Sequence, residues 1–137
     1  MATFKFELVS PERILFSGEV VSVIIPPVEG EMTVLAGHAP LVATLKAGIV
    51  FAQTDAGNGK EFFVNGGLVE INQASTTILA EQGRFIEDVD AAVLDAEILT
   101  AETRLAGTSD EAEQKRLHDV LVQLREFKGV FEQRKAA

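Results

Sequence analysis

The sequence predicts an α+β fold, with a β-sandwich or barrel over residues 1–85 and two antiparallel helices over residues 86–137. Up to about Glu81, apolar residues alternate with polar ones, which is the period of a strand with one buried face. Turn-forming residues recur there about every 8 to 12 positions, as in folds built from short strands. After Arg84 the turn residues cease and apolar residues are spaced by three and four, which is the period of a helix. The change of period divides the chain into two parts.

Short apolar segments separated by turns make up the strand-forming part. Phe4, Phe6 and Leu8 fall on one face of the first segment, and apolar runs follow at residues 20–25 and 49–51. The turns are marked by Ser10-Pro11-Glu12, Ser17-Gly18, Pro26-Pro27, Gly37-His38-Ala39-Pro40 and Gly66-Gly67. The segment from Asp55 to Lys60, with Ala56, Gly57, Asn58 and Gly59 between them, contains residues that tolerate positive φ. It predicts the exposed tip of a hairpin.

The first helix is predicted to run for about 18 residues, with Asp88 as its N-cap and Gly107 as its end. Its expected contact face is small and rich in alanine, and consists of Val89, Ala92, Ala96, Leu99, Thr103 and Ala106. Such a face allows a neighbouring helix to pack closely.

The second helix is predicted to begin with a capping box, in which Thr108 and Glu111 bond each other's backbone amides. Its apolar stripe consists of Leu117, Val120, Leu121, Leu124, Phe127 and Phe131. Because the loop between the two helices is so short, they must run antiparallel.

The composition restricts both the class of protein and its partners. The chain has 137 residues, 47% of them hydrophobic, and no cysteine, so we expect a folded protein without disulfides or thiolate metal sites. The first residues lack the pattern of a signal peptide, and no apolar run approaches the ~20 residues that cross a bilayer. These features predict a soluble, cytoplasmic protein. The net charge of −9 opposes binding to nucleic acid and direct binding to anionic membranes.

Residues suited to catalysis or metal binding are few. The only histidines are His38, in a turn, and His118, on the expected solvent side of the second helix. His38 and Glu31 could serve as the acid and base of a small enzyme, but a turn histidine more often bonds the backbone or a partner. Glu29 and Glu31 are only a weak pattern for a metal site. The glycine pairs lack the spacing and the lysine of phosphate-binding loops. We therefore expect no catalytic residue, no metal and no cofactor.

Several motifs, taken in order, carry a family resemblance. They are Ser10-Pro11-Glu12, Phe16-Ser17-Gly18-Glu19-Val20, Glu29-Gly30-Glu31-Met32-Thr33-Val34-Leu35, Gly37-His38-Ala39-Pro40-Leu41 and Gly66-Gly67-Leu68-Val69-Glu70. In this order and spacing the chain resembles the epsilon subunit of bacterial F-type ATP synthases, whose mitochondrial counterpart is called delta. The resemblance covers essentially the whole chain, including the two helices.

The resemblance implies an antiparallel β-sandwich of about ten strands followed by a helical hairpin. It also implies a non-catalytic subunit of the central stalk, or rotor, which couples rotation of the c-subunit ring through the gamma subunit to ATP synthesis. Such a subunit lies at the cytoplasmic face of the bacterial inner membrane and associates with the membrane only through the complex. Its sandwich, here residues 1–85, would bind both gamma and the c ring.

The resemblance also assigns partner-binding residues. In the family, the Glu-Gly-Glu turn faces the polar loops of the c ring, and the Gly-His-Ala-Pro segment and the first turn lie against gamma or near the ring. The corresponding residues here are Glu29, Gly30 and Glu31 for the c ring, and Ser10, His38, Ala39 and Pro40 for gamma or the neighbourhood of the ring.

The helical tail leaves a second function open. In many bacterial members the helices can extend and block ATP hydrolysis through contacts with the catalytic beta and alpha subunits, and some bind ATP through an Ile/Leu-Asp-x-x-Arg-Ala motif. Here Asp90 is retained but Val93 replaces the arginine, so we expect weak or absent ATP binding, with Asp90 as the contact if any remains. The positive charge of the tail is offset by acidic residues that lie among the basic ones. The basic residues are Lys115, Arg116, Arg125, Lys128, Arg134 and Lys135. A rotor subunit is therefore favoured over an inhibitory, nucleotide-sensing subunit.

Overall fold

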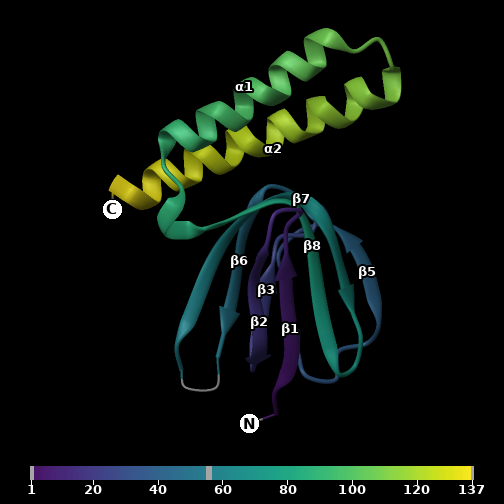
Figure 1. Cartoon of the computed structure of the whole chain (residues 1–137), viewed down its shortest axis with the longest axis vertical. Helices are drawn as coiled ribbons and strands as arrows, with labels where there is room; N and C mark the ends of the chain where they lie inside the picture. The colour runs from purple at the N-terminus through teal and green to yellow at the C-terminus, as the bar shows by residue number, and fades with distance from the viewer. Residues whose placement is uncertain (1, 55–56, 137) are drawn as a thin grey trace. The chain divides into compact units, whose positions relative to one another are not determined.

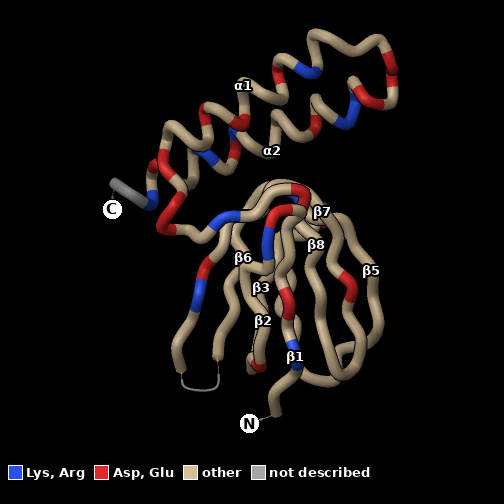
Figure 2. The backbone as a smooth tube through the Cα atoms, in the orientation of Figure 1, with Lys and Arg blue, Asp and Glu red and all other residues tan. Residues whose placement is uncertain are grey.

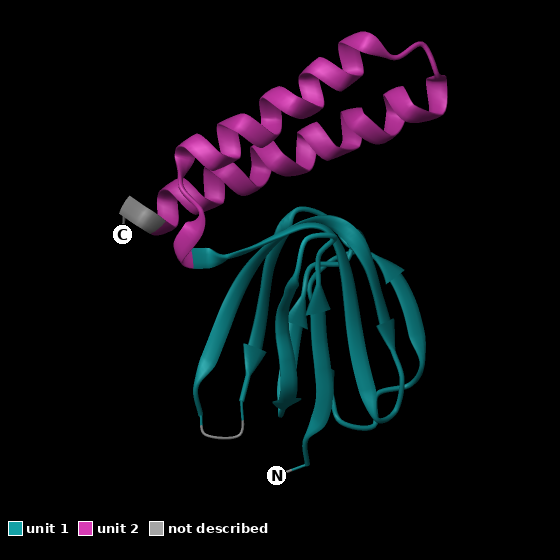
Figure 3. Cartoon of the chain, viewed as in Figure 1, with its two compact units in different colours: residues 1–86 teal, residues 87–137 magenta. Residues whose placement is uncertain are grey.

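The computed structural model of the chain describes residues 2–54 and 57–136. Asp55 and Ala56, in the predicted hairpin tip, lie outside the described residues. The chain divides into two compact units, residues 1–86 and residues 87–137, shown in different colours in Figure 3. The first unit contains all the strands of the described residues and the second contains both α-helices.

The first unit is a β-sandwich (Figure 1). Its strands are β1 (Phe4–Val9), β2 (Ile14–Val20), β3 (Ser22–Ile25), β4 (Met32–Leu35), β5 (Leu41–Thr44), β6 (Gly48–Gln53), β7 (Gly59–Ile71) and β8 (Ser75–Phe85). They pair in the order β2-β1-β8-β7-β6-β3-β4, and β5 pairs with β7. All of these pairings are antiparallel except the parallel pairing of β1 with β8.

The sandwich was expected and is confirmed, but the expected count of about ten strands was wrong. The described residues form eight strands, because β7 and β8 are long and continuous, with 13 and 11 residues. The first half of β7 pairs with β6 and its second half pairs with β5. A single long strand therefore forms the pairings that two shorter strands would otherwise form.

A pair of glycines allows β7 to change partners between its two halves. Gly66 and Gly67 have φ values of +78° and +122°, a region that residues with a side chain rarely adopt. A Cβ atom on Gly67 would lie 2.2 Å from the carbonyl oxygen of Leu79 on β8. The Gly67 carbonyl accepts a hydrogen bond of 2.9 Å from the backbone N–H of Leu45, just after β5. Gly67 thus permits both the bend and the close approach of three strands.

The core of the sandwich follows the alternation in the sequence. Phe4, Phe6 and Leu8 are all buried, as their spacing predicted. A row of aromatic rings crosses the core, with centroids 5.6 Å apart for Phe6 and Phe16, and 6.1 Å apart for Phe16 and Phe62. It ends at Phe85, whose ring lies 5.7 Å from that of Phe62. These contacts join β1, β2, β7 and β8.

A 3₁₀ turn (Ile86–Asp88) spans the boundary between the units, and the second unit contains α1 (Ala91–Gly107) and α2 (Glu111–Ala136). The two helices pack against each other as a hairpin, and α1 ends at Gly107 as predicted (Figure 1). On α2 the predicted stripe is confirmed, since Leu117, Leu121, Leu124, Phe127 and Phe131 are buried. Val120 is half-buried.

The predicted contact face of the first helix was wrong within α1, although Val89, just before the helix, is buried. Its buried residues are Leu94, Glu97 and Ala101, whereas Leu99 is 63% exposed. Both sets have helical spacing, so spacing alone could not choose between them. The observed face also includes the half-buried Ile98 and Leu105, so it removes more apolar surface from water than the alanine-rich face would.

Both predicted N-caps are displaced by two residues. Asp88 lies in the 3₁₀ turn, and the carboxylate of Asp90 accepts a hydrogen bond of 2.9 Å from the backbone N–H of Val93. At α2 the predicted capping box does not form. Asp110 is the residue directly before the helix, and its carboxylate accepts a bond of 3.0 Å from the N–H of Ala112. The Thr108 hydroxyl instead accepts from the N–H of Asp110, at 3.2 Å.

The glycine bend gives a stability prediction. The substitution Gly67→Ala should destabilise the sandwich by roughly 2 kcal/mol or more, because it combines an unfavourable φ with a clash against the backbone of β8. Urea unfolding followed by NMR signals of the sandwich measures this. Gly18→Ala in β2 is the matched control, since a Cβ atom there would lie 3.7 Å from its nearest neighbours, in the Phe16 ring. This substitution should shift stability by less than about 1 kcal/mol. Equal stability for the two variants would contradict this account of the bend.

Candidate partner-binding surfaces

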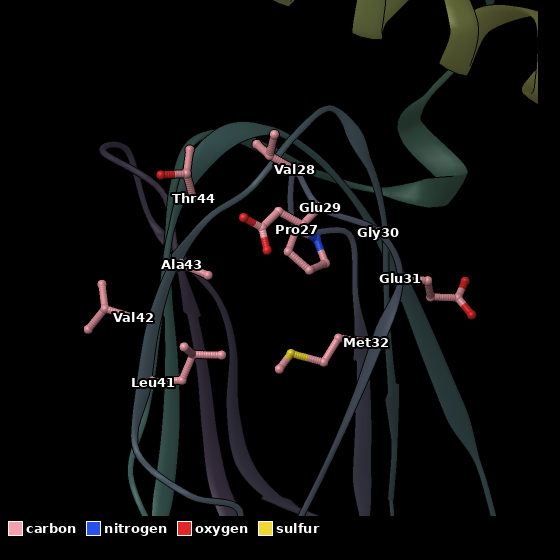
Figure 4. A pocket seen from close by; sticks show the side chains of 10 residues that line it. All are labelled: Pro27, Val28, Glu29, Gly30, Glu31, Met32, Leu41, Val42, Ala43 and Thr44. Carbon is pink, nitrogen blue, oxygen red and sulfur yellow. The ribbon is translucent and has the colours of Figure 1, made fainter.

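A groove opens between the β3–β4 loop and β5, with a volume of about 780 Å³ (Figure 4). The loop is held in place by its own backbone. Gly30 has a φ of +126° and donates a hydrogen bond of 3.0 Å to the carbonyl of Pro27. Val28 donates a bond of 3.0 Å to the carbonyl of Thr44 at the end of β5. The lining is formed by Pro27, Val28, Glu29, Gly30, Glu31, Met32, Leu41, Val42, Ala43 and Thr44.

All three predicted c-ring contacts line the groove. Glu29, Gly30 and Glu31 are all exposed. Figure 4 shows the Glu29 side chain directed toward β5 and the Glu31 side chain directed away from it. The two carboxylates therefore do not converge on one point. Among the described residues, no group of three His, Asp or Glu side chains is placed to hold a metal ion.

His38, Ala39 and Pro40, predicted to lie against gamma or near the c ring, are in the turn after β4. Gly37 has a φ of +79°, and the backbone N–H of His38 donates to the carbonyl of Leu35 at 3.2 Å. The Nδ1 atom of His38 lies 2.7 Å from the carbonyl oxygen of Ala39, so a protonated Nδ1 donates a hydrogen bond there. Ala39 and Pro40 are exposed. The turn is rigid and presents its last two residues to solvent.

The structure does not bring Glu31 and His38 together. They flank β4, whose four residues span roughly 13 Å, and so lie beyond opposite ends of the strand. Direct proton transfer between an acid and a base requires hydrogen-bond reach. The two residues therefore cannot act as a catalytic pair.

Ser10, the remaining predicted contact, is only 5% exposed. Its hydroxyl lies 3.2 Å from the carbonyl oxygen of Arg13 and 3.3 Å from a carboxylate oxygen of Glu12, and can donate to either. It also accepts from the backbone N–H of Arg13 at 3.4 Å. Ser10 thus shapes the turn between β1 and β2 from a buried position.

An exposed apolar surface on β5, β7 and β8 was not identified from the sequence. Val42, Leu68 and Leu79 are 64%, 46% and 56% exposed, and Leu68 pairs directly with Leu79. They line one shallow depression together with Glu70 and Thr77. We call these three residues the apolar patch. A signal for it exists in the adjacent apolar pairs Leu68-Val69 and Ile78-Leu79, because adjacent strand residues point to opposite faces.

The helical hairpin carries ion pairs that join its two helices. Arg125 on α2 lies 2.8 Å from Glu102 on α1, Arg104 lies 3.4 Å from Glu113, and Lys128 donates to Asp95. Figure 2 shows acidic and basic positions along both helices. The basic residues of the tail are thus partly engaged within the hairpin.

The hydrogen bond to Asp95 raises the pKa of Lys128 above its ordinary value of 10.5. A raised lysine pKa means that the pair contributes stability below that value, and that this contribution is lost only as the pH rises through the folded-state pKa. The pair is therefore intact at neutral pH.

The segment that corresponds to the family's ATP-binding motif lies at the start of α1. The Asp90 carboxylate caps the helix through Val93, and Val93 is half-buried and supplies no cation. A nucleotide would have to compete with the helix for this carboxylate.

The family of this chain is shown by direct comparison. Residues 3–85 match the family model described as ATP synthase, Delta/Epsilon chain, beta-sandwich domain. The chain belongs to this family. The resemblance inferred from the motifs is confirmed, and the chain is an accessory subunit of a rotary ATP synthase and not a catalytic one.

Relatives from the family match nearly the whole chain. The ATP synthase epsilon chain of Sinorhizobium medicae (strain WSM419) is 44% identical over 122 residues, which cover 89% of this chain and 90% of the relative. The ATP synthase epsilon chain of Bradyrhizobium sp. (strain BTAi1 / ATCC BAA-1182) is 43% identical over 133 residues, covering 97% and 95%. The similarity therefore includes the helical hairpin as well as the sandwich.

Solved structures share the fold. A chain of the Euglena gracilis mitochondrial ATP synthase, in a structure of OSCP/F1/c-ring, matches with a TM-score of 0.71 at 22% identity, covering 96% of this chain and 82% of that one. A chain of the Tetrahymena thermophila mitochondrial ATP synthase, from a structure of the central stalk and c ring, matches with a TM-score of 0.55 at 13% identity, covering 66% and 72%.

None of the described helices is long and apolar enough to span a bilayer.

Proposed function

We propose that this chain is a non-catalytic subunit of the central stalk that links the gamma subunit to the c ring and so couples ring rotation to ATP synthesis. The observation that carries the proposal is the apolar patch of Val42, Leu68 and Leu79 on the outer face of the sandwich. Soluble proteins expose contiguous apolar surface mainly where they bind a partner. The two solved structures that share the fold come from ATP synthase assemblies that contain a c ring.

The apolar patch is proposed to bind gamma. Its three side chains come from three strands that pair with one another, so their positions are fixed before a partner docks. A preformed apolar surface loses little conformational entropy on binding. The turn of Gly37 to Pro40 is held in place by the hydrogen bond from the His38 N–H to the Leu35 carbonyl. Its exposed residues Ala39 and Pro40 are proposed as further gamma contacts.

Replacing a residue of the apolar patch should weaken binding to gamma. Leu79→Gln should raise the Kd about tenfold, because a buried apolar contact is exchanged for a polar side chain without a partner. Isothermal titration calorimetry with purified gamma measures the change. Val130→Gln is the control, since Val130 is 63% exposed on α2 and its replacement should change the Kd less than twofold. Equal affinity of wild type and Leu79→Gln would remove the patch from the interface.

The loop of Glu29, Gly30 and Glu31 is proposed to bind cationic groups on the loops of the c ring. Both carboxylates are exposed and are carried by a loop tied to β5, so they can meet charges on a partner without rearrangement. Such rim charges chiefly determine association rate and register. Because the two carboxylates point in different directions, each can meet a different cation of the partner (Figure 4).

The double substitution Glu29→Gln/Glu31→Gln should lower affinity for detergent-solubilised c rings about three- to tenfold at low salt. Surface plasmon resonance at two salt concentrations measures it, and the difference from wild type should shrink at the higher concentration. The control Glu7→Gln/Glu19→Gln removes the same charge from β1 and β2. If both double variants weaken binding equally, the effect is general electrostatics and the loop is not a specific contact.

The helical hairpin is proposed to remain paired and to exert no brake on ATP hydrolysis. Its two helices share a buried apolar stripe and three ion pairs, and an extended arm would have to give these up. The alternative is a regulatory subunit whose C-terminal helices inhibit hydrolysis in a nucleotide-dependent way, through contacts with the catalytic beta and alpha subunits. The capping role of Asp90 and the presence of Val93 speak against nucleotide sensing.

Removal of the hairpin distinguishes these alternatives. The reconstituted catalytic head with gamma should hydrolyse ATP at the same rate with the full chain and with a chain ending at Glu87, because a paired hairpin has no inhibitory contact to lose. Calorimetry of the full chain with MgATP should show no binding. A several-fold rise in hydrolysis on truncation would instead establish the regulatory function.

The proposal also gives the location of the chain. Held by gamma and the c ring, it would lie at the cytoplasmic face of the bacterial inner membrane, as a peripheral protein whose membrane association depends on the complex. The net charge of −9 supports this dependence, because anionic lipid head groups repel such a surface.

A further inference from the structure

A polar cavity of about 460 Å³ lies where the β1–β2 turn meets the end of β8. It is lined by Glu12, Arg13, Gln82, Gly83 and Arg84. Residues 1–86 contain five cationic side chains in all, which are Lys5, Arg13, Lys46, Lys60 and Arg84. Two of the five therefore line this one cavity, although the sandwich as a whole is acidic.

Hydrogen bonds hold the backbone of Arg13, and its guanidinium lies over an aromatic ring. The carbonyl of Arg13 accepts a hydrogen bond of 2.9 Å from the backbone N–H of Ser10, and the Ser10 hydroxyl adds further bonds to the same turn. The Arg13 guanidinium lies over the ring of Phe85, 5.0 Å from its centroid. Phe85 in turn belongs to the aromatic row of the core. Little side-chain freedom remains to be lost when a ligand binds.

Arg13 is exposed and lacks an acidic partner within the described part of the chain, where no carboxylate comes within ion-pair distance of it. Its neighbour Glu12 has a carboxylate oxygen placed to accept from the Ser10 hydroxyl, at 3.3 Å. A guanidinium that rests on an aromatic ring still offers its edge, with paired N–H groups, to a ligand.

We propose that this cavity binds an Asp or Glu side chain of the gamma subunit, with Arg13 donating to both carboxylate oxygens. The proposal rests on the proposed attachment to gamma and names a specific polar contact within it. Carboxylates match the fork of a guanidinium and form bidentate pairs with it. A phospholipid head group offers similar oxygens, but an anionic membrane surface would be opposed by the chain's net charge of −9.

The positive charge of this contact would complement the charges of the other two proposed surfaces. The Glu29 and Glu31 loop offers negative charge, the apolar patch offers none, and Arg13 offers positive charge. Opposite charges at separate positions on one rigid sandwich allow only one orientation of a complementary partner, because a rotated partner would meet like charge.

The test compares Arg13→Gln with wild type, as full chains, in calorimetry with purified gamma. We expect the Kd to rise about tenfold at low salt and the difference to shrink at high salt, as for a charge pair. Arg13→Lys keeps the charge and loses the fork, so it should fall between the two. Lys60→Gln removes one exposed cation elsewhere on the sandwich and should change the Kd less than twofold. NMR spectra of each variant establish that the fold is retained.

Each outcome decides the matter. If wild type binds gamma and Arg13→Gln binds equally well, the inference is overturned while the proposed function stands. If wild type does not bind gamma at all, the proposed function fails as well. If Arg13→Gln keeps its affinity for gamma but loses binding to phosphatidylglycerol vesicles that wild type shows, the ligand is a lipid phosphate and the inference is overturned. If Arg13→Gln fails to fold, the intermediate affinity of Arg13→Lys decides, and wild-type affinity for that variant would overturn the inference.

Discussion

The passage of Gly67 against the backbone of β8 is the contact on which the sandwich depends. It lets β7 bend, pair with β6 before the bend and with β5 after it, and still accept the Leu45 hydrogen bond at the corner. The apolar patch exists because β5 joins β7 beyond this bend, and the groove exists because the β3–β4 loop is bonded to the end of β5. Both proposed interfaces therefore depend on the absence of a Cβ atom at Gly67.

The proposed role in coupling rotation requires binding surfaces that stay fixed relative to one another. Here each surface is carried by strands or by a turn whose backbone is hydrogen-bonded, and the aromatic row joins four strands across the core. Interiors packed in this way deform little under load. In this proposal the chain contributes binding surfaces in fixed positions, and other subunits carry out the chemistry of the assembly.

Much of the architecture follows from the sequence because hydrophobic period is a local property. The alternation of Phe4, Phe6 and Leu8, the stripe of α2 and the end of α1 at Gly107 were all predicted correctly. The buried face of α1 was not, since its two candidate faces have the same spacing and only tertiary packing chooses between them. The strand count that the resemblance implied was too high, and the turn predicted at Gly66 and Gly67 is a bend within a continuous strand. The apolar patch was missed because cross-strand neighbours such as Leu68 and Leu79 are distant in the chain.

The apolar patch also has a consequence for the cell that makes this chain. A copy without its partner would expose Val42, Leu68 and Leu79 together on an already folded domain, so folding alone does not hide them. Surplus copies would then be prone to stick to one another or to attract chaperones and proteases. Selection should accordingly favour synthesis of this subunit in proportion to its binding partners. Three exposed side chains on a β-sandwich would thus limit how far its expression can exceed theirs.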